Sequence, residues 1–330
     1  MLPSTLLASD PSQFVRGVFD VGSGSTKVNV STIDKCLQKI NAELFQGSEK
    51  VGYKQSLTDN QNSFAPTIIE QGEHAIETLK KAAEAEVSVI SALTKTGQKS
   101  VQWRGIATSA FRQSKNGKES LDRFSKNTSI PFKIIPQEEE AKLGFAAGIS
   151  LAKDPSKAIV WDIGGGSQQI TFKESKTKIK MLMFEKGAET VKNKILQDVL
   201  KKDPSKIKTP NPIGKMHLAE SQKAIQDIFP ENQFDKIPAN FELIGIGGVH
   251  QFSIPKATSK NESYTLDDVS TALTNYLEKD DAAIKDKYAD TMVTNLILVE
   301  TLLNRMRLKD VKICKYGIAD GYMLVNDNWK

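Results

Sequence analysis

Two stretches of the sequence share a pattern of residue types that could bind phosphate. Residues 19–30 (FDVGSGSTKVNV) align without a gap onto residues 161–172 (WDIGGGSQQITF). Each copy has an apolar strand that leads into an aspartate, a glycine-rich turn that ends in serine, and a second strand of alternating apolar residues. The second copy begins almost half a chain after the first. We therefore predict two similar lobes, each with one turn, and expect the turns to face each other across a cleft.

Each copy has the composition of a β-hairpin, with glycines where the backbone is expected to take unusual dihedral angles. Glycines also let backbone N–H groups approach an anion, so each turn can form a nest for phosphate oxygens. An ordinary glycine-rich turn is the alternative for one copy, but the matched pair favours phosphate binding. The residues of the two copies that we predict to bind phosphate are Gly22, Ser23, Gly24, Ser25, Lys27, Gly164, Gly165, Gly166 and Ser167.

An aspartate precedes each turn, near the end of a predicted buried strand. Asp20 and Asp162 would repel a phosphate group in the turn unless a cation lay between them. Mg²⁺ is a hard ion that accepts carboxylate and phosphate oxygens and keeps several waters. We therefore predict that these two aspartates hold Mg²⁺, with Mn²⁺ as the alternative ion. The other interpretation is that they are polar caps of buried strands.

A third glycine-rich turn, residues 245–248 (GIGG), follows the predicted strand at residues 242–246. We expect Gly247 and Gly248 to close a further wall of the phosphate site. The sequence has no GxxxxGK[ST] motif, and neither of the first two turns completes GxGxxG, which disfavours Walker-type and Rossmann nucleotide sites.

Short β-branched runs alternate with amphipathic stretches, which predicts a mixed α/β fold. We expect strands at residues 15–19, 27–32, 101–107, 132–135, 158–161, 169–172, 181–184 and 242–246. We expect helices at residues 67–85, 138–152, 266–277 and 290–307, the third of them with Thr265 as its N-cap. The turn-forming residues 153–156 predict a boundary between a first lobe at 13–152 and a second at 153–330, whose C-terminal segment is free to pack back on the first.

Composition excludes several classes of protein. The chain has 330 residues, of which 39% are apolar and 26% charged, so it can bury two cores. Its most apolar run, residues 296–299, is too short to cross a bilayer, and residues 1–10 lack the features of a signal peptide, which predicts a cytoplasmic protein without a membrane partner. Two distant cysteines and three scattered histidines argue against a disulfide framework or a structural zinc site.

Positive charge is concentrated between residues 173 and 215, a segment that contains twelve lysines and five acidic residues. One interpretation is a solvated face, and the other is a track for a polyanion. The segment has no arginine and Phe184 as its one aromatic residue, so a phosphate chain suits the track better than nucleic acid does.

Five ordered motifs resemble those of the exopolyphosphatase and guanosine pentaphosphate phosphohydrolase (Ppx/GppA) family, which is part of the actin-like ATPase-fold superfamily. They are residues 20–25 (DVGSGS), 107–112 (ATSAFR), 138–143 (EEEAKL), 162–167 (DIGGGS) and 317–321 (GIADG). The resemblance implies two actin-like α/β lobes with mixed sheets, helices on both sides and an active site between them. It also implies hydrolysis of a terminal phosphoanhydride of inorganic polyphosphate or of pppGpp, and leaves a homodimer open.

The resemblance assigns catalytic roles to three residues. Glu140 would orient and deprotonate the attacking water, and Arg112 would stabilise charge on the phosphoryl oxygens. Their alternatives are a helix-start carboxylate favoured by the dipole and a surface salt bridge. Gln169 stands where the family usually has the glutamate that helps arrange metal or water, and Gly24 where it usually has asparagine.

Two other functions stay open. Gln169 is neutral and offers less to Mg²⁺ than glutamate does, so the chain could be a phosphate-binding protein with little turnover. Lys27 near the first turn is a feature that is closer to actin than to the family. Together with the glycine turn at 245–248, it would suit an actin-fold ATPase or a small-molecule kinase.

Overall fold

The computed structural model describes residues 13–34, 36, 39–94 and 100–329. It divides into two compact units. Unit 1 contains Met1–Leu143 and Ile318–Lys330, and unit 2 contains Gly144–Gly317. The N-terminal segment on which the signal-peptide prediction rests lies outside the described residues. None of the described helices combines the length and hydropathy needed to cross a bilayer.

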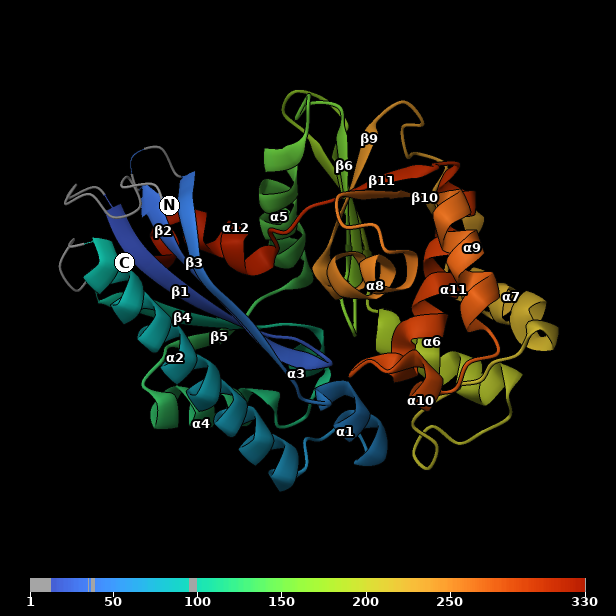
Figure 1. The fold of residues 1–330 in the computed structure, drawn as a ribbon, viewed down its shortest axis with the longest axis horizontal. Helices are drawn as coiled ribbons and strands as arrows, with labels where there is room; N and C mark the ends of the chain where they lie inside the picture. The colour runs from blue at the N-terminus through green and yellow to red at the C-terminus, as the bar shows by residue number, and fades with distance from the viewer. Residues whose placement is uncertain (1–12, 35, 37–38, 95–99, 330) are drawn as a thin grey trace. The chain divides into compact units, whose positions relative to one another are not determined.

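Unit 1 is built on a five-stranded mixed sheet with the order β3-β2-β1-β4-β5 (Figure 1). The first three strands are antiparallel neighbours, whereas β4 and β5 run parallel to β1. The strands are β1 (Gln13–Val21), β2 (Ser25–Asp34), β3 (Lys39–Lys50), β4 (Val101–Ala107) and β5 (Phe132–Ile134).

Helices cover both faces of this sheet, because its central strand is apolar on both sides. Phe19 of β1 is fully buried against α2 and α4, whereas the adjacent Val18 is fully buried on the other face, against α12. The helices of unit 1 are α1 (Tyr53–Asp59), α2 (Pro66–Thr94), α3 (Ser109–Gln113), α4 (Gly117–Thr128), the first half of α5 (Gln137–Gly148), and α12 (Ile318–Leu324).

Unit 2 repeats this plan. Its six-stranded sheet has the order β10-β11-β9-β6-β7-β8, and read from β8 the first five strands follow the pattern of unit 1. In each unit an antiparallel three-stranded meander is followed by parallel additions beside its first strand. The strands are β6 (Ala158–Ile163), β7 (Gln168–Lys173), β8 (Ile179–Phe184), β9 (Glu242–Ile246), β10 (Ser263–Thr265) and β11 (Asp310–Ile313).

The largest core of unit 2 forms around α11, whose central residues are buried on nearly every side, as expected of a helix inside a core. Trp161 of β6 belongs to this core, and its neighbour Val160 packs on the opposite face. The longer helices of unit 2 are α6 (Ala188–Lys194), α7 (Leu218–Ile228), α9 (Leu266–Tyr276) and α11 (Ala289–Met306). The shorter ones are α8 (Ile254–Thr258), α10 (Asp281–Ile284) and the π-helical turns η2 (Ile195–Val199) and η5 (Val249–Ser253).

The chain passes from unit 1 to unit 2 inside α5, nine residues before the boundary predicted from the sequence. Leu143 packs in the core of unit 1, whereas Phe145 packs in unit 2 and Gly148 lies so close to Val160 that a Cβ there would be 2.7 Å from that side chain. Packing partners therefore change in the middle of the helix, and the turn-forming residues 153–156 mark only where the helical region ends.

The C-terminal residues return to unit 1. Asn29 of β2 donates a 2.8 Å hydrogen bond to the carboxylate of Asp320, and Arg16 of β1 donates to the carbonyl of Met323. Trp329 completes the attachment, because the guanidinium of Arg16 lies 4.6 Å from its ring centre.

The mixed α/β fold predicted from the sequence is confirmed, and each of the eight predicted strands is present. The edge strand β3 was not predicted because most of its side chains are exposed or half-buried, with Leu44 as its buried apolar residue. Strands β10 and β11 were not predicted because they are only three and four residues long.

The N-cap predicted at Thr265 is a complete capping box. The Thr265 hydroxyl accepts from the N–H of Asp268 at 3.1 Å, and the Asp268 carboxylate accepts from the N–H of Thr265 at 2.9 Å. The Thr265 hydroxyl also donates to this carboxylate at 2.9 Å, and the hydrogen bonds from the Thr265 N–H and hydroxyl, the backbone one first, lower the pKa of Asp268.

We expect Thr265→Ala to lower the free energy of unfolding by about 1 kcal/mol, measured in urea, because one helix N–H loses its acceptor. Thr274→Ala is the matched control, since Thr274 is an exposed residue of the same helix. The difference between Thr265→Ala and wild type should shrink as the pH falls through the lowered pKa of Asp268, because the protonated carboxyl no longer forms the charged partner of the cap. Equal losses from the two variants would contradict this role of Thr265.

Candidate functional site

The two glycine-rich turns close their hairpins in the same way. The N–H of Gly22 donates to the carbonyl of Ser25 at 2.9 Å, and the N–H of Gly164 donates to the carbonyl of Ser167 at the same distance. Residues 22–25 therefore form a first glycine loop between β1 and β2, and residues 164–167 form a second glycine loop between β6 and β7.

A helix start holds each loop by its carbonyl groups. In the first loop, the carbonyl of Ser23 accepts from the N–H of Lys54 at 2.8 Å, at the start of α1. In the second loop, the carbonyl of Gly164 accepts from Ala188 at 3.0 Å and that of Gly165 from Glu189 at 2.8 Å, both in the first turn of α6. The two loops thus have equivalent supports.

The N–H groups of the loops are the donors left for a ligand. Those of Ser23, Gly24, Gly165 and Gly166 donate to no other residue in the described part of the chain. Adjacent N–H groups of this kind form an anion-binding nest. The geometry of each loop is therefore compatible with the phosphate site predicted from the sequence.

The expectation of unusual dihedral angles in these loops was wrong. Among the described residues, the glycines with positive φ are Gly214 and Gly247. A Cβ on Gly22 would lie 3.4 Å from the carbonyl oxygen of Ser25, and one on Gly164 would lie 3.2 Å from that of Ser167. The loop glycines therefore serve mainly to keep their backbone uncovered.

Gly187, which the sequence analysis missed, is required by close packing beneath the second loop. A Cβ on Gly187 would lie 2.3 Å from the carbonyl oxygen of Gly164 and 2.7 Å from the nitrogen of Ser167. The available signal was a single glycine after a strand and immediately before a helix, which is weaker than a repeated motif.

The two predicted metal-binding aspartates occupy equivalent positions in their hairpins. Asp20 pairs across the ladder with Lys27, and Asp162 pairs with Gln169. Directly opposed residues of an antiparallel pair share a face of the sheet. Unit 1 therefore places an ammonium beside its aspartate, whereas unit 2 places a neutral amide at the corresponding position.

Asp20 is half-buried, and its Oδ1 accepts no hydrogen bond from the described residues. Burial raises the pKa of Asp20, and the ammonium of Lys27 opposes that rise. An unsatisfied carboxylate oxygen at the end of β1 is suited to a ligand that supplies positive charge or a proton donor.

Asp162 lies against the third glycine turn. Gly247 has a φ of +82°, and a Cβ there would be 2.3 Å from Oδ1 of Asp162. Gly248 is the residue immediately before η5. The structure thus brings the predicted residue Gly247 to the aspartate of the second loop, and any side chain at that position would displace the carboxylate.

Gln169 is 1% exposed, and neither atom of its side-chain amide has a hydrogen-bond partner among the described residues. A buried amide without partners costs free energy. Its place opposite Asp162, one residue into β7, makes it a candidate contact for a ligand or an ordered water.

Arg112 and Glu140, predicted separately from the sequence, form an ion pair in unit 1. Nη1 of Arg112 lies 2.8 Å from Oε2 of Glu140 and donates a further 3.0 Å hydrogen bond to the carbonyl of Ile135. The side chains are 15% and 6% exposed, so Arg112 forms a salt bridge that is partly withdrawn from solvent, and its catalytic role stays a prediction.

The neighbours of Glu140 show how it differs from an ordinary helix-start carboxylate. Glu138 pairs with Lys142 and Glu139 pairs with Lys133, and the partners in both ion pairs are substantially exposed. Glu140 is the buried member of the run and pairs with the candidate arginine.

Short connections place this pair near the first loop. Helix α3 follows β4 directly, and the N–H of Thr108 donates to the carbonyl of Val21 at 3.2 Å, next to Gly22. Arg112 is one helical turn later, where its own N–H donates to the carbonyl of Thr108 at 3.1 Å.

Part of the lysine-rich segment lies away from the second loop within unit 2. Four of its lysines lie around the turn between β7 and β8, at the end of the sheet opposite the loop, about 17 Å away for five residues of strand. Lys186 is near the loop, but its ammonium donates to the carbonyl of Ile228 at 3.0 Å. Lys192 is buried, so the segment is not a uniformly solvated face. The track for a polyanion stays a prediction from the sequence.

Comparisons with known proteins agree with these features. The model of the Ppx/GppA phosphatase family matches residues 38–326, which include Arg112, Glu140 and the second loop. An exopolyphosphatase from Cytophaga hutchinsonii superposes with a TM-score of 0.70 at 20% identity, covering 96% of this chain and 99% of that one. The Aquifex aeolicus PPX-GPPA enzyme superposes with a TM-score of 0.67 at 14% identity, covering 94% and 99%. The structures establish a shared actin-like fold, and the family match over most of the sequence shows that the chain belongs to the Ppx/GppA phosphatase family.

Proposed function

We propose that the protein hydrolyses a terminal phosphoanhydride, as an exopolyphosphatase that releases phosphate from inorganic polyphosphate, as a pppGpp phosphohydrolase, or as both. The family membership supports the reaction class. The observation that carries the proposal is the ion pair between half-buried Arg112 and buried Glu140, in which the two residues suited to hydrolysis are in contact.

Each group has a defined task in this reaction. Glu140 orients a water molecule in line with the terminal phosphorus and accepts its proton as the new P–O bond forms. Arg112 binds phosphoryl oxygens through its guanidinium, and the loop N–H groups bind the remaining phosphate oxygens. The bond to the bridging oxygen then breaks, and orthophosphate leaves.

The oxygen donors of the glycine loops suit Mg²⁺. Asp162 lies in a space that is kept open by the missing side chain of Gly247, and Asp20 has an unsatisfied oxygen. At either aspartate, water and phosphate oxygens would complete the ligand shell, as Mg²⁺ prefers. When bound, Mg²⁺ or Mn²⁺ would neutralise phosphate charge.

The family membership supports the reaction class but does not distinguish polyphosphate from pppGpp as the substrate. The Cytophaga hutchinsonii neighbour is an exopolyphosphatase, and four of the lysines in the lysine-rich segment lie at the end of the sheet opposite the second loop. Polyphosphate and pppGpp therefore belong in the same assay. The cytoplasmic location and the homodimer stay predictions from the sequence.

Gln169 supports a second candidate, a phosphate-binding protein with slow turnover. Its buried amide has no partner, and it replaces the glutamate usual in the family, so a bound phosphate could be held without efficient hydrolysis. Tight binding of polyphosphate or pppGpp by calorimetry, without phosphate release, would favour this function.

We expect Glu140→Gln to lower kcat for phosphate release by about 10²–10⁴-fold, because the amide cannot accept the proton of the attacking water. The measurement is orthophosphate release from polyphosphate and pppGpp in Mg²⁺ buffer, with ATP as a third substrate. Glu139→Gln removes an equal charge from the adjacent, partly exposed position and should leave kcat nearly unchanged. Equal activity of Glu140→Gln and wild type, or hydrolysis confined to ATP, would overturn the proposal.

We expect Gln169→Glu to raise phosphate release about tenfold, a barrier change of about 1.4 kcal/mol, if the second loop holds Mg²⁺. Without metal, the new carboxylate faces Asp162 across the ladder, so the melting temperature of the variant should fall and Mg²⁺ should restore it. Gln169→Met removes the same amide without adding charge and controls for its loss. A melting temperature that does not respond to Mg²⁺ would argue against a metal at Gln169.

A further inference from the structure

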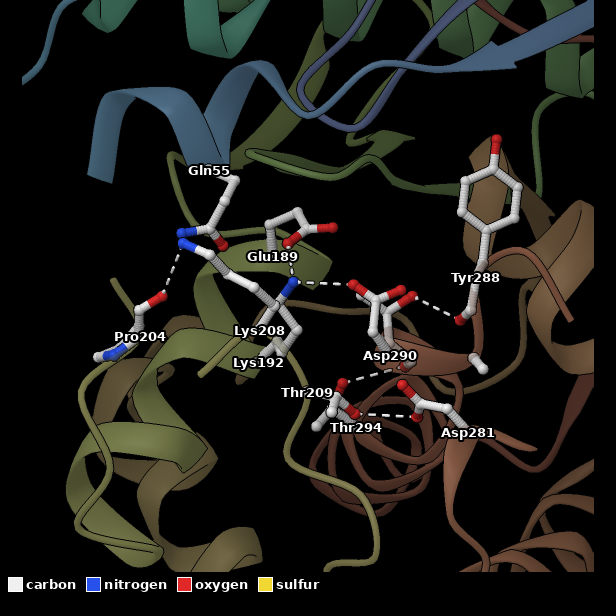
Figure 2. A network of polar contacts seen from close by, with 12 residues as sticks. Gln55, Glu189, Lys192, Pro204, Lys208, Thr209, Asp281, Tyr288, Asp290 and Thr294 are labelled. Carbon is white, nitrogen blue, oxygen red and sulfur yellow. Dashed lines mark hydrogen bonds and ion pairs between the residues drawn. The ribbon is translucent and has the colours of Figure 1, made fainter. Parts of the chain in front are cut away.

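Behind the second loop lies a buried lysine that the proposed reaction does not use. The side chain of Lys192 in α6 is 3% exposed, and its ammonium lies 2.6 Å from Oε2 of Glu189 and 3.0 Å from Oδ2 of Asp290. Figure 2 shows this ammonium between the two carboxylates. Glu189 and Asp290 are in the first turns of α6 and α11, so Lys192 connects the starts of two helices.

The ion-pair network of Lys192 includes Glu189, whose own backbone supports the second loop. The N–H of Glu189 donates to the carbonyl of Gly165, and the N–H of the preceding Ala188 donates to that of Gly164. Fixing the Glu189 side chain therefore fixes the peptide groups that hold two of the four loop residues.

The same segment is anchored from the strand side. The indole of Trp161 donates to the side-chain carbonyl of Gln168 at 2.9 Å, and the Gln168 amide donates to the carbonyl of Lys186 at 3.1 Å. Residues 186–189 are thus held by β7 at one end and by Lys192 at the other, and Lys192 adds an ionic link to α11 beside the apolar contacts between Val191 and the α11 core.

The charge balance distinguishes Lys192 from a phosphate-binding lysine. Burial acts to lower its pKa, but the carboxylates of Glu189 and Asp290 outweigh burial and raise the pKa above its ordinary value. The ammonium stays charged, with two negative groups bound to it, and offers nothing to a substrate anion. Removing it would leave two half-buried carboxylates that repel each other.

We propose that Lys192 is a positioning residue of the second glycine loop, which acts through Glu189 and the first turn of α6 and keeps the N–H groups of Gly165 and Gly166 available to phosphate. Its effect on catalysis rests on the proposed function, whereas its effect on the loop does not.

The test is amide hydrogen exchange without ligand. In Lys192→Met, protection factors at Ala188 and Glu189 should fall at least tenfold relative to wild type, because the first turn of α6 loses its ionic link to α11. Lys194→Met is the matched control, since it removes an ion pair to Asp198 from the same helix without touching Glu189. Unchanged protection at Ala188 and Glu189 in folded Lys192→Met, or an equal fall in Lys194→Met, would overturn the inference.

The pH dependence separates positioning from general loss of stability. In Lys192→Met the opposed carboxylates should have raised pKa values, so protection should recover as the pH is lowered and one of them takes up a proton. Asp290→Asn, which keeps the Lys192–Glu189 pair, provides a milder variant if Lys192→Met fails to fold, and should show a smaller fall at the same amides. A fall in Lys192→Met that does not recover at lower pH, or no fall in Asp290→Asn, would contradict the electrostatic mechanism.

Binding of inorganic tripolyphosphate with Mg²⁺ provides the functional arm. We expect Lys192→Met to raise KM and the dissociation constant at least tenfold with a smaller change in kcat, since the chemical groups Glu140 and Arg112 are untouched. If wild type neither binds nor hydrolyses tripolyphosphate, the proposed function fails while the exchange result still decides the role of Lys192. Altered exchange together with unchanged tripolyphosphate affinity would overturn the link between the loop and phosphate.

Discussion

The candidate site depends on backbone hydrogen bonds between loop carbonyls and helix starts. Ser23 in the first loop, and Gly164 and Gly165 in the second, accept from the first residues of α1 and α6. Once these carbonyls are bound, the loops present N–H groups as their available polar atoms. The glycines contribute by leaving this backbone uncovered. The helices, the meander strands and Gly187 all maintain that one arrangement.

The two units share a strand order and a glycine-loop hairpin, but they carry different side chains at corresponding positions. Asp20 faces Lys27 across its ladder, and Asp162 faces Gln169. Burial raises the pKa of Asp20 and the ammonium of Lys27 opposes that rise, whereas the residue paired with Asp162 is a neutral amide. The two hairpins therefore differ in the charge next to the aspartate, although their backbones correspond.

Repeated motifs made much of this predictable from the sequence. The two hairpins, the sheet strands that flank them and the Thr265 cap follow from local patterns, whereas Arg112 and Glu140 were identified through the resemblance to the Ppx/GppA family. Gly187 and Lys192 could not be predicted from local patterns, because their importance comes from contacts with the second loop and with α11 rather than from neighbours in sequence. The boundary inside α5 was missed for the same reason: periodicity defines a helix but not which core each turn joins.

The return of the C-terminal residues to unit 1 affects the order in which the protein can be built. Unit 2 is one continuous segment, whereas the core of unit 1 includes Ile318, Tyr322 and Met323. A ribosome delivers these three after every residue of unit 2, so the α12 face of the sheet of unit 1 stays uncovered until unit 2 has been synthesised. The sequestration of that apolar face during translation is then a task for the unfinished chain or for a chaperone.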